Sequence, residues 1–176
     1  DHLTRVIHRL LQLLSWPGPL PARDLAAFYA QCEGDIPLHL DRVVYEPSNM
    51  ARPYLADMMR VGLSPIQAGV RGQFVATMAA GRFVSFDGPH DYLEGASSIT
   101  VPFLVVSGRA DHLCPPERTV TFFDRLGSTD KTWRTFGLDQ GDHADYGHVD
   151  LCNGDHAADD VYPFLAQWLH ERIAGR

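Results

Sequence analysis

An aspartate and a histidine in the C-terminal half of the chain have the order and setting of a catalytic acid–base pair. Asp111 closes the segment Gly108-Arg109-Ala110-Asp111, directly after a short apolar run, and His148 stands in the later polar loop 145–150. In such a pair the carboxylate holds the Nδ1 proton of the imidazole and fixes its tautomer, so that Nε2 can take a proton from a nucleophile. An acid followed by a histidine matches the last two members of a Ser-Asp-His relay.

Each of these two residues has an alternative reading. An aspartate that follows a strand often caps the next turn through its side chain, which would give Asp111 a structural role. His143, five residues before His148, is a second candidate for the base. Pairing with Asp111 favours His148, and both alternatives remain open at the level of sequence.

A metal site is a different reading of the same loop. Five residues within an eleven-residue stretch carry the nitrogen, oxygen and sulfur donors that zinc accepts, namely Asp142, His143, His148, Asp150 and Cys152. The stretch contains neither two histidines one helical turn apart nor a C-x-x-C pair, so its spacing is poor for a metal. We therefore predict no metal and no cofactor, and keep a metal-binding loop as a less favoured alternative.

The segments around this pair predict alternating strands and helices. The run 101–108 is apolar, β-branched and bounded by Pro and Gly, which is typical of a buried parallel strand. A helix is predicted to start at Pro115, a second strand over 133–138, and a closing helix over 156–173. This order of strand, helix, strand and helix places the C-terminal half in the α/β class, with short parallel strands flanked by helices.

The N-terminal half predicts helices and loops instead. Six aliphatic residues at helical spacing predict a first helix, namely Leu3, Val6, Ile7, Leu10, Leu11 and Leu14. A second short helix is predicted over 24–32, and a third that is capped by Ser64 and ended by Gly81. We therefore expect a helical lid over 1–98 and the core over 99–176. The apolar stripe Phe74, Met78, Phe83 and Phe86 is either the core of that lid or the lining of an acyl-chain pocket.

Three motifs in the C-terminal half carry a family resemblance. They are a strand followed by G-x-x-D-x-x-x-P-P over 103–116, Y-G-H-x-D-L over 146–151, and V-x-P-x-x-x-x-W-L over 161–169. Together they resemble the C-terminal part of an α/β-hydrolase, in the lipase and polyhydroxyalkanoate-synthase-like branch, and 81–88 resembles the end of that branch's lid. The resemblance implies that Asp111 is the acid and His148 the general base of an ester hydrolase or acyl transferase.

The nucleophile elbow of that family, G-x-S-x-G, is not found in this sequence. Gly62-Leu63-Ser64-Pro65-Ile66 imitates it, but Pro65 has no backbone N–H to donate to an oxyanion. Gly95-Ala96-Ser97-Ser98-Ile99 lacks the second glycine. We therefore expect this chain to carry the acid and base without the serine, and to be inactive when isolated. We expect the N-terminal half of the parent fold, or a second copy, as its partner, and a non-catalytic interaction module is the alternative.

Composition excludes several other classes. The 176 residues carry a formal net charge of −7, from 22 acidic against 15 basic side chains, so no phosphate-tracking surface and no nucleic-acid partner are expected. No apolar stretch approaches the roughly 20 residues that a membrane span needs. The three cysteines, Cys32, Cys114 and Cys152, are widely spaced, which favours free thiols in a reducing compartment such as the cytoplasm.

Overall fold

A computed structural model describes residues 45–51, 53–54, 57–58, 61 and 64–174. The helices expected over 3–14 and 24–32, and Cys32, lie outside the described residues. The chain divides into two compact units. Among the described residues, the first unit holds those from 57 to 95 and the second holds 45–51, 53–54 and 96–174. The sequence gives no indication that the segment around residue 49 goes with the second unit.

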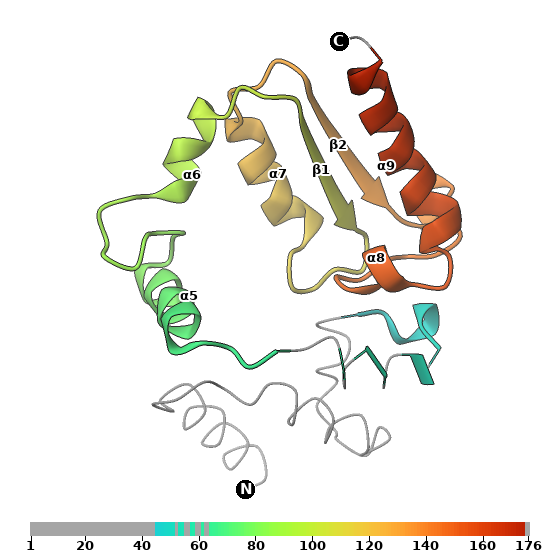
Figure 1. Cartoon of the computed structure of the whole chain (residues 1–176), viewed down its shortest axis with the longest axis horizontal. Helices are drawn as coiled ribbons and strands as arrows, with labels where there is room; N and C mark the ends of the chain where they lie inside the picture. Colours follow the sequence, from blue (N-terminus) through green and yellow to red (C-terminus); the bar gives the residue numbers. More distant parts are fainter. Residues whose placement is uncertain (1–44, 52, 55–56, 59–60, 62–63, 175–176) are drawn as a thin grey trace, which may run out of the picture. The chain divides into compact units, whose positions relative to one another are not determined.

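The first unit is built on helix α5 (Ala68–Ala80) (Figure 1). Gly81 ends this helix in a left-handed conformation, with φ 63° and its N–H bonded to the carbonyl oxygen of Met78, as the sequence predicts. The predicted start at Ser64 is wrong. The backbone of Gln67 is still extended, with φ −64° and ψ 149°, so the first helical residue is Ala68.

A short turn leads from α5 to helix α6 (Tyr92–Gly95). Val84 and Asp91 form an antiparallel bridge across this turn. The Asp91 side chain caps α6, because its Oδ1 accepts hydrogen bonds from the N–H groups of Leu93 at 2.9 Å and Glu94 at 3.2 Å. The turn and the short helix are thus fixed by one aspartate.

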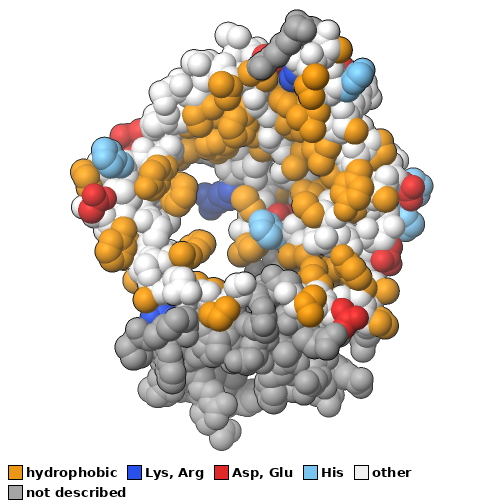
Figure 2. Space-filling view, in the orientation of Figure 1, with side chains coloured by type: hydrophobic (Ala, Val, Ile, Leu, Met, Phe, Trp, Pro, Cys, Tyr) orange, Lys and Arg blue, Asp and Glu red, His pale blue; other side chains and the backbone are white. Residues whose placement is uncertain are grey.

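The apolar stripe of this unit is exposed. Phe74, Met78, Phe83 and Phe86 are each more than half exposed, so they are not the packed core of the unit. Figure 2 shows hydrophobic side chains on the surface over α5. Phe86 lies against the helix at Gly72, where an added Cβ would come within 2.7 Å of its ring.

The second unit contains two parallel strands, β1 (Phe103–Gly108) and β2 (Lys131–Phe136), joined through helix α7 (Pro116–Arg125). The predictions of a strand that ends at Gly108 and of a helix that follows Pro115 are confirmed, although β1 begins at Phe103, two residues after the start of the apolar run. The second strand begins and ends two residues earlier than predicted, because the chain turns at Gly137 into a 3-10 helix, η3 (Leu138–Gln140).

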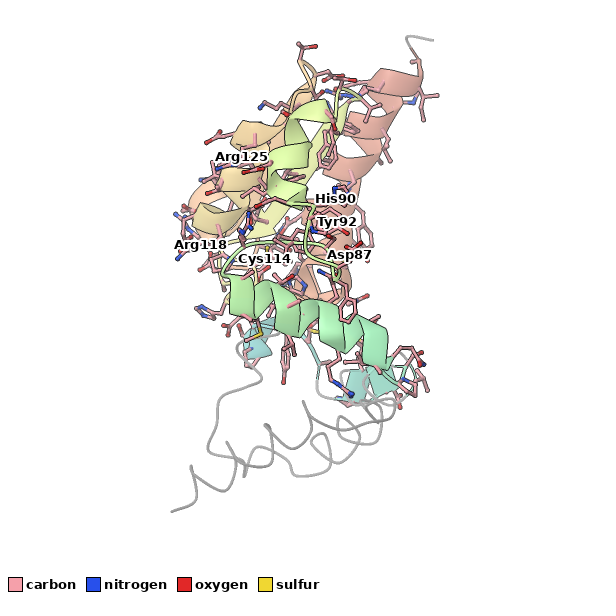
Figure 3. The ribbon with its side chains drawn as sticks, turned by 90° about the vertical axis from the view of Figure 1, so that its left-hand side faces the viewer. Asp87, His90, Tyr92, Cys114, Arg118 and Arg125 are labelled. Atoms are coloured by element: carbon pink, nitrogen blue, oxygen red, sulfur yellow. The ribbon has the colours of Figure 1, made fainter. Side chains whose placement is uncertain are left out.

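Helix α7 covers one face of the strand pair. Phe122 packs on Phe103 and Phe123 on Trp133, with ring centroids 5.7 and 5.9 Å apart. On the same face, Trp133 Nε1 donates to the hydroxyl of Ser107 at 3.2 Å. Figure 3 shows the side chains of Arg118 and Arg125 along this helix. Side chains alternate between the faces of a strand, so every second residue of β1 and β2 meets α7.

The closing helix α9 (Ala157–Ile173) covers the opposite face, and Figure 1 shows the strands between α7 and α9. Phe164 packs edge-on against Phe136 with centroids 5.7 Å apart, and Trp168 Nε1 donates to Thr132 Oγ1 at 3.0 Å. The prediction of this helix is confirmed. The short helix α8 (Asp150–Asn153) precedes it in a segment that the sequence presents as a polar loop.

The core of the second unit lies between β2, the loop before α8, and α9. Its buried members are Phe136, Ala144, Tyr146, Leu151, Ala157 and Val161. This core therefore rests directly under the loop that carries His148. Within the part of the chain that is described, no helix has the length and apolar character that crossing a membrane requires.

Candidate active site

Asp111 and His148 lie side by side at the carboxyl end of the strand pair. Asp111 follows β1 by three residues, and its N–H donates to the carbonyl oxygen of Gly108 at 3.2 Å, which closes a tight turn. His148 Nδ1 lies 2.9 Å from Asp111 Oδ2. The carboxyl ends of parallel strands meet at one edge of a sheet, which explains how residues 37 positions apart come together.

The two oxygens of Asp111 have different partners. Oδ1 accepts the N–H groups of Leu113 at 2.9 Å and Cys114 at 2.7 Å, while Oδ2 faces His148. The carboxylate is only 5% exposed. The turn-capping role and the histidine-holding role are therefore both filled by one side chain.

The His148 ring has the exposure that proton transfer needs. Its side chain is 45% exposed, in contrast to the 4% of its partner Asp111. With Nδ1 beside a carboxylate, Nδ1 carries the proton and Nε2 is the nitrogen that can take one from a nucleophile. The arrangement can act as a general base and then as a general acid.

Backbone contacts hold the two loops together independently of this pair. The N–H of Ala110 donates to the carbonyl oxygen of Tyr146 at 2.8 Å. This bond joins the loop of Asp111 (108–111, the acid loop) to the loop of His148 (145–150, the base loop). A Cβ on Gly108 would lie 2.1 Å from the same oxygen, so the end of β1 approaches the base loop as only glycine permits. The distance between acid and base is thus set by main-chain packing.

His143, the other candidate base, is brought to a different carboxylate. Its Nδ1 lies 2.6 Å from Asp160 Oδ1, and its backbone N–H donates to Asp160 Oδ2 at 2.8 Å. The Tyr146 hydroxyl donates to the same Oδ2 at 2.6 Å, and the ring of His156 stacks on His143 with centroids 5.2 Å apart. Asp160 on α9 therefore holds His143, while Asp111 holds His148.

The contacts around Asp160 shift the pKa values of three groups. The bond and the charge of Asp160 raise the pKa of His143 above its ordinary value. Burial opposes ionisation of Asp160, but bonds from Tyr146 and His143 outweigh it and hold the pKa of that carboxyl below its ordinary value. Burial, with the bond to Asp160, raises the pKa of the Tyr146 phenol, so that the hydroxyl stays a donor.

Four of the five residues considered as metal ligands have separate partners, and the thiol of the fifth is unpaired among the described residues. Asp142 accepts from Arg134 Nη2 at 2.6 Å and from the Gly137 N–H at 2.7 Å, and Cys152 is an exposed free thiol. Across the residues whose placement is described, no three histidine, cysteine, aspartate or glutamate side chains gather as a metal site.

Two buried polar residues bind the loop that carries His148 and are not predicted from the sequence to do so, Asp150 and Asn49. Asp150 is fully buried and Asn49 is 5% exposed. Asn49 Nδ2 donates to Asp150 Oδ2 at 2.7 Å, across 101 residues of sequence. Asp150 stands between apolar neighbours in the Y-G-H-x-D-L motif, which could have marked it as buried, but nothing in the sequence around Asn49 points to this contact.

A hollow of about 450 Å³ opens in the same unit. Its lining includes Asn49, His143, Asp145 and His156, and it includes neither Asp111 nor His148. The acid–base pair therefore does not line this hollow, although Ala110, directly before Asp111, does.

Comparison with known proteins relates part of this chain to hydrolases. The family model described as serine aminopeptidase, S33 (Hydrolase_4) matches residues 84–143, which include Asp111. A poly(3-hydroxyalkanoate) polymerase subunit of Haloarcula marismortui is 32% identical over 92 residues, which are 52% of this chain and 17% of that protein. No solved structure matches. The chain spans about a sixth of its relative's length, and it is related to the α/β-hydrolases, with a poly(3-hydroxyalkanoate) polymerase subunit among its relatives.

Proposed function

We propose that this chain carries the acid and the base of a serine-type ester hydrolase or acyl transferase. The single observation that supports this most strongly is the 2.9 Å contact between His148 Nδ1 and Asp111 Oδ2. The buried carboxylate and the half-exposed ring give each partner the environment that its role needs. In this role Asp111 orients the imidazole and stabilises its cation.

The proposed reaction proceeds through an acyl ester of a serine. His148 Nε2 takes the proton of the serine hydroxyl as its oxygen attacks the acyl carbonyl, and the imidazolium then gives this proton to the departing alcohol. In the second half, Nε2 takes a proton from water or from another alcohol, whose oxygen attacks the acyl carbonyl. The bond from the acyl carbon to the serine oxygen then breaks, and the imidazolium gives its proton to that oxygen, which restores the serine hydroxyl. Water gives hydrolysis, and an alcohol gives transfer.

We propose that the serine comes from the N-terminal half of the parent fold or from a second copy, and that the reaction takes place in the cytoplasm. The name of the polymerase relative favours a hydroxyacyl group, whose own hydroxyl can serve as the attacking alcohol.

The test is active-site labelling of the natural polypeptide that contains these residues. A fluorophosphonate probe reacts with a serine that is activated by a histidine, and mass spectrometry of the peptides identifies that serine. We expect H148Q and D111N to slow the labelling by roughly 100-fold or more, because each removes part of the base.

H143Q is the matched control, since it alters a neighbouring histidine that is paired with Asp160 and not with Asp111. We expect H143Q to label at close to the unaltered rate. Labelling that is unaffected by H148Q would overturn the proposed function, and the complete lack of a labelled serine would favour the non-catalytic interaction module.

A further inference from the structure

We propose that Asp150 and Asn49 are positioning residues, which form a buried clasp that holds the His148 loop against Asp111. The clasp is the set of hydrogen bonds that joins the segment 45–49 to the segment 145–155. Its link to catalysis rests on the proposed function, whereas its effect on the ring of His148 does not.

Asp150 is the centre of the clasp. Its side chain is fully buried, yet both carboxylate oxygens are occupied. Oδ2 accepts the N–H of Gly147 at 2.8 Å and the amide of Asn49 at 2.7 Å, and Oδ1 accepts the N–H of Glu46 at 3.1 Å. A buried carboxylate is tolerated when donors surround it in this way. One of these donors belongs to the residue directly before His148.

Asn49 connects both ends of the base segment. Besides its bond to Asp150, its Nδ2 donates to the carbonyl oxygen of Asp145, and its own carbonyl oxygen accepts the N–H of Asp155 at 2.8 Å. One asparagine therefore contacts the start, the middle and the end of the segment that carries the base. Its contacts tie that segment to a distant part of the chain, because 101 residues separate Asn49 from Asp150.

Gly147 is tightly packed within the clasp. A Cβ at this position would lie 2.7 Å from Asp150 Oδ1 and 2.7 Å from the backbone nitrogen of Glu46. The main chain at Gly147 is thus packed between the backbone of Glu46 and the carboxylate of Asp150. A movement of Asp150 would therefore displace the backbone directly before His148.

The base loop has two anchors on adjacent residues. The carbonyl oxygen of Tyr146 accepts the N–H of Ala110 from the acid loop, and the N–H of Gly147 is held by Asp150. Loss of the clasp leaves the Tyr146 anchor alone. The His148 ring, which is 45% exposed, can then swing away from Asp111, and the Nδ1 proton becomes open to water.

The experiment follows the Nδ1 proton of His148 by NMR in the full chain labelled with 15N-histidine, with H148Q to assign the resonance. N49A and D150N are the test variants. L126A is the matched control, because it removes methyl groups from a buried position, 4% exposed, at the end of α7 and outside both the clasp and the core under the His148 loop. We expect exchange of this proton with water to be roughly 10-fold faster or more in N49A and D150N, and unchanged in L126A.

N49A is the milder variant, since Asp150 keeps its bonds to Gly147 and Glu46, and it decides the matter if D150N fails to fold. Circular dichroism shows whether each variant is folded. The clasp would be overturned if the Nδ1 proton in N49A stayed as protected as in the unaltered chain. It would also be overturned if L126A lost as much protection as N49A.

A second readout separates the clasp from the proposed function. In the natural polypeptide, N49A is expected to lower kcat for ester cleavage by roughly 10- to 100-fold with little change in KM, because the base and not the substrate is misplaced. If neither the unaltered polypeptide nor any variant cleaved esters, the proposed function would be contradicted. The NMR result would then still test the clasp. Activity that N49A does not reduce would overturn the clasp alone.

Discussion

Oδ2 of Asp111 faces Nδ1 of His148 at 2.9 Å, while Oδ1 of the same carboxylate binds two main-chain N–H groups. The second set of bonds fixes the carboxylate plane, so that Oδ2 has little freedom to turn away from the ring. The local turn and the acid–base pair therefore depend on one side chain. This division of labour makes the two roles separable by mutation.

We predict that D111N keeps the turn and loses the chemistry. The asparagine oxygen can still accept the N–H groups of Leu113 and Cys114, and its amide then faces His148 and favours the wrong tautomer. Ester cleavage by the natural polypeptide should fall by roughly 100- to 10,000-fold. Thermal unfolding should change little, and kinetics near those of the unaltered protein would contradict the assignment of the acid.

We predict that the isolated 176-residue chain does not hydrolyse p-nitrophenyl butyrate. A histidine without a nucleophile provides only weak general-base help, and no G-x-S-x-G elbow is found in the sequence. Release of p-nitrophenol should stay at the rate of the buffer. Turnover that a fluorophosphonate abolishes by labelling a serine of this chain would refute the expectation.

The His143–Asp160 pair predicts a pH-dependent stability. The pKa of His143 is raised from 6.5, so its contribution is complete below 6.5 and is lost as the pH rises through the folded-state pKa. The pKa of Asp160 is lowered from 3.8, so its contribution is present above 3.8 and is lost as the pH falls through the folded-state value. The free energy of unfolding of the unaltered chain should thus exceed that of H143Q most near pH 5, and this difference should shrink above pH 6.5. Urea unfolding of both proteins measures this stability gap.

Because His143 is largely exposed, this gap should also narrow as salt is added. A gap that is constant from pH 5 to pH 8 would show that the pair contributes nothing through charge.

Two glycines should respond to alanine in opposite directions. G108A places a Cβ 2.1 Å from the carbonyl oxygen of Tyr146 and should destabilise the chain by about 2 kcal/mol or more. At Gly69, on α5, an added Cβ meets nothing within 4 Å, so G69A should be neutral or stabilise by about 0.5–1 kcal/mol. Urea titration of both variants tests this difference, and equal effects would contradict the close approach at Gly108.

Much of the second unit could be predicted from local sequence. The apolar run at 103–108 and the helical spacing of 157–173 encode β1 and α9 with little ambiguity, because the residues that form each element also form its buried face. The start of β2 could not be placed, because it is polar. Lys131 opens the strand, and its amine donates to the carbonyl oxygens of Phe123 at 2.8 Å and Leu126 at 3.1 Å, at the end of α7.

Only the candidate site residues that are marked by their local sequence could be predicted. Asp111 stands just after β1, and His148 is marked by the motif over 146–151, twelve residues after the end of β2. The role of Asn49 could not be predicted, because it arises from contacts with residues about a hundred positions away. The preference of His143 for Asp160 also depends on packing, since α9 brings this carboxylate to the base loop.

The clasp implies an order of events in folding. Asp111 and His148 are joined over 37 residues, but Asn49 and Asp150 are joined over 101, and closing the longer loop costs more chain entropy. We expect the strand pair with its acid turn to form first, and the segment around Asn49 to dock late. In stopped-flow measurements N49A should then speed unfolding while leaving the folding rate nearly unchanged, and slowed folding would refute this order. We therefore expect His148, the proposed base, to be fixed beside Asp111 only after the acid turn has formed.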